Sequence, residues 1–365
     1  MPLTSKQEQH AGDSSNQYQI NQVTINKGLT ENQATKVFQD LIPVVLSSYK
    51  DMAARIAEEH INQFKNKLLP RIEKVEGAFE NFKDPAFQMQ LRRAQMSAAV
   101  SDQESDLDML SQLMINHIEA KGDRNKKLGI KKAIEIIGEI DNQALLALTV
   151  LYVFLCLIPI EDDVNSGLNT LEELYSKILY QELPKNNTWI EHLEILNTIK
   201  IYQYDSNVKI NDICTSMLEG YAAAGIKKGS ANFNIACNFL HSVGMDTDVF
   251  ITNPLLEGYL LLPVVNKNEL ENLSLNKYDK KGQLSSKEIK VLHQIFDLYD
   301  NGEGKEKAIK NFIELWDEHP NLKRIHDWTD KIPFRIDLNI VGAILSTTNI
   351  IRVVPELKNL NIMED

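Results

Sequence analysis

The segment from Ala144 to Ile160 constrains the fold more than any other part of the chain. Its sequence, ALLALTVLYVFLCLIPI, carries no charge, whereas Asp141 precedes it and three acidic residues, 161–163, follow it. As a helix it would be about 26 Å long at ~1.5 Å per residue, slightly less than the ~30 Å hydrocarbon core of a membrane. Because a helix that is apolar all round must be covered by other helices or by lipid, two interpretations are open. We expect a buried central helix of a helical bundle, and membrane insertion is the alternative.

The residues that flank this segment on its two sides favour different interpretations. Lys126, Lys127, Lys131 and Lys132 precede it, on the side that the positive-inside rule would keep cytoplasmic. Its other flank is acidic, and Pro159 lies close to its end. The second observation favours the buried helix.

The remainder of the chain carries mainly helical patterns. Apolar residues recur every three to four positions from Tyr49 to Phe82, which predicts a long N-terminal helix, kinked near Pro70. Pro43 should interrupt the helix before it, and Asp84-Pro85 is typical of the start of the next one. Further helix starts are predicted by the capping-box pairs Thr30/Gln33, Thr170/Glu173, Thr188/Glu191 and Ser285/Glu288.

Two short segments favour β structure. The pattern of residues 18–26 (YQINQVTIN) predicts an extended arm. Its candidate interaction residues are Ile20, Val23 and Ile25, because a free strand can add to a sheet in another chain. Residues 199–210 alternate weakly and could form a small hairpin that turns at 205–207. The predicted fold class is all-α, a multi-helix bundle with minor β. Its predicted parts are a disordered tail (1–17), an N-terminal helical domain with the arm (18–165) and a C-terminal helical domain (166–365).

Charge argues against a general nucleic-acid binder. The 365 residues include 39 Lys and Arg against 51 Asp and Glu, which gives a net charge of −12. Residues 208–221 and 230–243 could form a helix-turn-helix, but the second helix contains no Lys or Arg for phosphates or guanines. We therefore expect a protein partner or self-association, no nucleic acid, and a membrane only under the alternative above.

No pattern in the chain predicts a chemistry. Cys156, Cys214 and Cys237 are widely spaced among apolar or small residues, which indicates reduced thiols in a cytoplasmic protein. His319 and His326 belong to the densest histidine and carboxylate cluster, EHPNLKRIHD, but Pro320 should end a helix between them. A calcium loop at 277–288 would place lysines at two ligand positions. We predict no catalytic residue, no cofactor and no metal ligand.

Two segments carry a family resemblance. Residues 82–118 (FKDPAFQMQLRRAQMSAAVSDQESDLDMLSQLMINHI) and the helix VGAILSTTNIIR at 341–352 resemble an uncharacterised bacterial family catalogued by locus tags from Legionella and Veillonella. The matching positions include Asp84, Pro85, Phe87, Gln88 and Gly342, and Leu345 departs from the family pattern. A looser similarity is to the abortive-infection alpha group. The resemblance implies a bacterial cytoplasmic protein, with phage defence or stress response as its setting, and it carries over no catalytic residue.

These observations together predict a non-enzymatic protein that acts through protein–protein association. The first alternative is a membrane-active, pore-forming effector that uses residues 144–160. The second is an enzyme whose site residues are dispersed along the chain.

Overall fold

The computed structural model describes residues 30–47, 49–101, 103–271, 273 and 284–359. The predicted tail (1–17) and the predicted arm (18–26), with Ile20, Val23 and Ile25, lie outside these residues.

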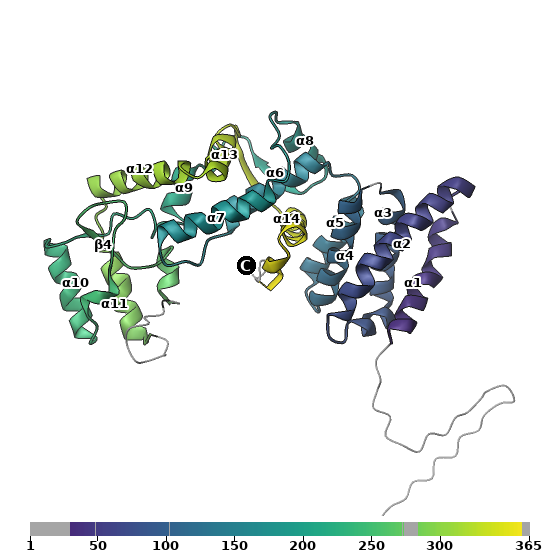
Figure 1. The fold of residues 1–365 in the computed structure, drawn as a ribbon, viewed down its shortest axis with the longest axis horizontal. Coiled ribbons are helices and arrows are strands. Elements are labelled where there is room, and N and C mark those ends of the chain that lie inside the picture. Colours follow the sequence, from purple (N-terminus) through teal and green to yellow (C-terminus); the bar gives the residue numbers. More distant parts are fainter. Residues whose placement is uncertain (1–29, 48, 102, 272, 274–283, 360–365) are drawn as a thin grey trace, which may run out of the picture.

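Five helices form one end of the molecule (Figure 1). They are α1 (Glu31–Leu46), α2 (Asp51–Glu73), α3 (Pro85–Val100), α4 (Glu104–Glu119) and α5 (Arg124–Ile136), with a 3₁₀ turn at Ala78–Lys83 before α3. The sequence signals for two of these starts are confirmed. Thr30 and Gln33 form the capping box of α1, and the Asp84 carboxylate accepts a hydrogen bond from the Ala86 N–H at the start of α3.

Two predictions about this end of the chain were wrong. α1 continues through Pro43 to Leu46, because this proline lies on the exposed side of the helix, where its missing N–H leaves little buried structure disturbed. The long helix is also shorter than predicted, since α2 ends at Glu73. Its buried face begins at Ala57, whereas Ile56 is 51% exposed. Hydrophobic periodicity therefore located α2 but assigned part of its solvent-facing side to the core.

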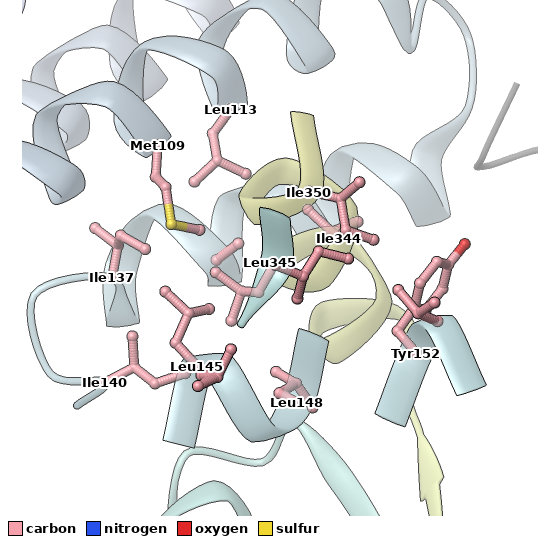
Figure 2. Close-up of a cluster of buried hydrophobic side chains, with 14 of the residues drawn as sticks. Met109, Leu113, Ile137, Ile140, Leu145, Leu148, Tyr152, Ile344, Leu345 and Ile350 are labelled. Atoms are coloured by element: carbon pink, nitrogen blue, oxygen red, sulfur yellow. The ribbon is translucent and has the colours of Figure 1, made fainter. Parts of the chain in front are cut away.

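The apolar segment forms α6 (Asn142–Cys156), which packs against α14 (Ile340–Val353). Every side chain from Ala144 to Phe154 is buried. In Figure 2, Leu145, Leu148 and Tyr152 of α6 gather with Ile344, Leu345 and Ile350 of α14, and with Met109 and Leu113 of α4. The helix ends earlier than the apolar run: Cys156 and Ile160 are exposed, and Leu155 is only half-buried. Within the described residues no helix is long and apolar enough to cross a membrane.

α14 approaches its neighbours closely. A Cβ atom on Gly342 would lie 2.3 Å from the backbone oxygen of Thr198, so only glycine fits this contact without a shift. The helix also carries buried polar groups, of which Asn349 donates to the Thr149 hydroxyl of α6 at 2.9 Å. These contacts fix the position of α14 against α6 and against the residue before β1, and they explain why its sequence mixes apolar with small polar residues.

Further helices and a two-stranded sheet contribute to the same large hydrophobic cluster as α6. The helices are α7 (Val164–Ile178), α8 (Thr188–Ile195), α9 (Ile210–Thr215), α12 (Glu303–Asp317) and α13 (Pro320–Thr329). Strand β1 (Ile199–Tyr202) pairs antiparallel with β5 (Arg335–Leu338), with Ile199 opposite Leu338. The predicted hairpin within 199–210 is therefore wrong, because β1 finds its partner far along the chain.

Two of the predicted capping boxes in this region were also wrong. The N-cap of α7 is Asp163, which places Thr170 inside that helix. The N-cap of α8 is Asn187, so Thr188 is already its first helical residue.

A second hydrophobic cluster lies at the far end of the molecule from α1. It is built by β2 (Ile226–Lys227), α10 (Ala231–Ser242), β3 (Ile251–Thr252), β4 (Tyr259–Leu261) and α11 (Ser286–Phe296). The three strands are antiparallel in the order β2-β4-β3. Ser285 and Glu288 form the predicted capping box of α11. The all-α fold class with minor β is confirmed, and the predicted domain boundary between residues 165 and 166 stays a prediction.

Candidate interaction surface

Helices α3 and α5 lie side by side and share an outer surface. The Ser97 hydroxyl of α3 donates to the backbone oxygen of Ile134 in α5 at 2.9 Å. Arg93 of α3 and Glu135 of α5 form an ion pair at 3.8 Å, with both side chains about one-third exposed. These contacts join two rows of side chains, which we call the α3–α5 surface.

The first row runs along α3 and is apolar. Met89, Met96 and Val100 are separated by seven and four residues, so they lie with Arg93 on one side of the helix. Their side chains are 50%, 51% and 65% exposed. Methionine is common at protein-binding surfaces because its unbranched side chain adapts to different partners.

The second row runs along α5 and combines an apolar residue with charge. Leu128 is 56% exposed, and Lys132 and Glu135 follow on the same side of the helix at helical spacing. Because Glu135 is paired with Arg93, this row lies next to the row on α3. The α3–α5 surface is therefore made of Met89, Arg93, Met96 and Val100 from α3 with Leu128, Lys132 and Glu135 from α5.

The charge of α5 is unusual for a protein with a net charge of −12. The helix carries five cations, Arg124, Lys126, Lys127, Lys131 and Lys132, against the single carboxylate of Glu135. Three of these cations lie in or beside the first turn, which contains no acidic residue. A cation at this end of a helix is repelled by the helix dipole, whose N-terminal end is positive. The N-cap Asp123 supplies one carboxylate at this end of α5, and the neighbouring cations outnumber it. Departures of this kind are expected where a surface serves a function.

The pKa of Glu135 responds to the positive charges around it. Its hydrogen bond from Lys132 is the main cause of a pKa below the usual range, and the nearby charges of Lys131 and Arg93 act in the same direction. The carboxylate is therefore ionised at neutral pH, and the cations still outnumber it. A partner for this surface should present acidic side chains around an apolar centre.

The predicted site residues do not meet at this surface. Ile20, Val23 and Ile25 lie outside the described residues, so their interaction role stays a prediction. His319 and His326 are separated by the start of α13 at Pro320, as the sequence predicted. His319 contacts the backbone oxygen of Leu315 at 3.0 Å, and His326 contacts the Asp317 carboxylate at 2.8 Å. The described residues contain no group of three or more His, Cys, Asp or Glu that could hold a metal ion.

The cysteines occupy three different environments. Cys214 is buried, and burial raises the pKa of its thiol to about 12, so the thiolate needed for nucleophilic attack is scarce at neutral pH. Cys237 is half-buried, and Cys156 is exposed at the end of α6. Cys214 therefore packs as a small hydrophobic side chain, whereas Cys156 does not.

Sequence reasoning missed the α3–α5 surface for a physical reason. In the sequence, the lysines of α5 indicate only a basic flank of the apolar segment that follows them. Met89 and Met96 resemble core residues in any one-dimensional pattern. Only the folded arrangement, in which α4 and α14 cover the inner side of α5, reveals which apolar residues remain outside.

Comparison with known protein families gives a match over most of the chain. The model of a protein family named for a Veillonella locus tag matches residues 28–363. This confirms the resemblance seen in residues 82–118 and 341–352, whereas the looser similarity to the abortive-infection alpha group stays a prediction. No curated protein and no solved structure matches the chain.

Proposed function

The chain belongs to the family named for a Veillonella locus tag, and we propose that it acts by binding another protein through the α3–α5 surface. The observation that carries this proposal is the coincidence of exposed apolar side chains with unbalanced positive charge on two adjoining helices. The proposed partner is a protein that presents an apolar helix face bordered by Asp and Glu. We place this association in the cytoplasm, where reduced cysteines are the normal state.

The two components of the surface have separate roles in this proposal. Met89, Met96, Val100 and Leu128 supply the apolar area that a partner helix covers. The cations of α5 attract an acidic partner and disfavour a basic one, so they control the association rate and the specificity. A partner held in this way dissociates more readily as the salt concentration rises.

Photo-crosslinking in the cell tests the proposal. A photoreactive amino acid replaces Met96, and a matched control replaces Ile235, an exposed apolar residue on the outer side of α10. We expect an adduct with a second protein from position 96 and none from position 235. Mass spectrometry should locate the adduct in an acidic, helix-forming segment of that protein.

A charge reversal sharpens the experiment. Changing Lys131 and Lys132 to Glu alters two side chains on the solvent side of α5, where neither is buried, so the variant should fold normally. We expect it to lose most of the adduct at position 96. An adduct that persists unchanged would contradict the proposal, as would adducts only with a second copy of this chain or only with lipid.

A further inference from the structure

A cavity lies between α13 and the segment that joins α7 to α8. Its volume is about 560 Å³, within the range of ~300–1,000 Å³ typical of small-molecule sites. One side is formed by the segment from Glu182 to Asn187 together with Trp189 of α8. The other side is formed by one face of α13, including Arg324 and Trp328, and by Lys331 and Ile332 after the end of that helix.

Direct contacts join the two sides of the cavity. Trp189 and Trp328 pack with ring centroids 5.4 Å apart. The indole N–H of Trp328 donates to the backbone oxygen of Pro184 at 3.1 Å. Arg324 contacts the backbone oxygen of Gln181 at 3.4 Å and the Glu182 carboxylate at 3.6 Å. The cavity is therefore held open by the fold, which lowers the entropic cost of ligand binding.

The lining has an apolar part and a cationic part. Its apolar residues are Leu183, Pro184, Trp189, Pro320, Trp328 and Ile332. Its charged residues are the cations Lys185, Lys323, Arg324 and Lys331 and the carboxylates Glu182 and Asp327. The cations outnumber the carboxylates two to one, in a protein whose net charge is negative.

Two of these four cations have no acidic partner among the residues that the structure describes. Lys323 is paired with Asp327 at 3.3 Å, and Arg324 with Glu182. Among the residues that the structure describes, neither Lys185 nor Lys331 forms an ion pair, and both are exposed. Ammonium groups that border a cavity without an acidic partner are suited to bind an anion, and phosphate in particular.

We propose that this cavity binds a nucleoside monophosphate. Lys185 and Lys331 would hold the phosphate, and the flat base would contact the aromatic and aliphatic residues of the lining. The side-chain amides of Asn186 and Asn187 add hydrogen-bond donors and acceptors that a base can use. The ligand thus needs a ring and a phosphate in one molecule, and this site is separate from the proposed protein-binding surface.

Calorimetric titration of the full-length protein tests the proposal with defined probes. The probes are AMP, GMP, CMP and UMP, with adenosine as the ring alone and inorganic phosphate as the anion alone. We expect at least one monophosphate to bind about tenfold or more tightly than either adenosine or inorganic phosphate, since each part adds its own contacts. Two of the three tryptophans line the cavity, so fluorescence should change on the same titration.

Charge variants test whether the monophosphate binds in this cavity. Lys331→Glu and Lys185→Glu should each weaken monophosphate binding by about tenfold, the effect expected from losing a charge-assisted hydrogen bond. Lys290→Glu, an exposed lysine of α11, is the matched control and should leave binding unchanged. Thermal melting of all three variants checks that each is folded.

Three results would overturn the proposal. The first is that none of the four monophosphates binds. The second is that inorganic phosphate or adenosine binds as tightly as the best monophosphate. The third is that the Lys290 control loses as much affinity as the two cavity variants.

Discussion

Helices α5 and α6 follow each other in the chain and have nearly the same length, but the fold uses them in opposite ways. Each begins after an aspartate, Asp123 and Asp141, whose side chain accepts hydrogen bonds from the first turn. α6 has no charged residue and is buried on every side from Ala144 to Phe154. α5 buries a narrow face around Ile130 and Ile134, and none of its cations is fully buried. The residue that caps a helix therefore does not decide whether the helix is buried. Burial depends on how charged residues are distributed around the helix.

The largest expected effect on folding comes from placing a lysine, the main charged residue of α5, inside α6. Leu151 is 1% exposed, so Leu151→Lys would bury an ammonium group in a helix that carries no charged residue. Because an unpaired buried charge costs far more than a cavity, we expect no folded protein, measured as loss of soluble expression.

Leu128→Lys is the control on α5. Leu128 is more than half exposed, and the same change there should leave folding intact. A well-folded, monodisperse Leu151→Lys protein would show that α6 is not required in the core. The membrane-active alternative predicts that outcome, with loss of membrane association alone.

Removing apolar volume should give a smaller but clear difference between the two helices. Leu148 is fully buried, and Leu148→Ala should lower the free energy of unfolding by about 2–5 kcal/mol. Leu128→Ala should change it by about 0.5 kcal/mol or less, since surface substitutions seldom do more. Chemical denaturation of both variants measures the difference. Equal losses would mean that Leu128 is covered in solution, for example by a second copy of the chain.

A helix start on the surface should have an intermediate effect. The Asp84 carboxylate accepts a hydrogen bond from the Ala86 N–H at 2.9 Å at the beginning of α3. Asp84→Ala should therefore lower the free energy of unfolding by about 0.5–2 kcal/mol, and Asp84→Asn should recover most of that loss. A thermal melt that does not change with Asp84→Ala would contradict the assignment of this cap.

The sequence was sufficient for several features that depend on neighbouring residues, although it misplaced the starts of α7 and α8. The sequence predicts the helix caps Thr30, Asp84 and Ser285, because a cap needs only a polar side chain two or three residues before the backbone N–H from which it accepts a hydrogen bond. The buried position of α6 followed from its lack of charge, since no amphipathic orientation was available to it.

Features that depend on distant residues could not be predicted in this way. β1 pairs with a strand more than 130 residues further along the chain, and nothing in the local pattern around Ile199 identifies that partner. Trp189 and Trp328 are equally far apart, although their rings are in contact. The exposed methionines of α3 have the spacing of core residues, so only tertiary packing distinguishes them. Both proposed binding sites therefore consist of residues whose role is set by the fold.

The smallest expected effect separates the function of α5 from its stability. Lys126 lies in the first turn of α5, where the positive end of the helix dipole disfavours a cation. Lys126→Glu should therefore raise the free energy of unfolding by about 0.3–1 kcal/mol, measured by chemical denaturation at low salt. The same variant should weaken the photo-crosslink from position 96, because the positive field that attracts an acidic partner is reduced. A gain in stability together with a loss of crosslink would show that α5 keeps this lysine for binding. A loss of stability would instead show that Lys126 serves the fold, and the main electrostatic argument for the α3–α5 surface would then fail.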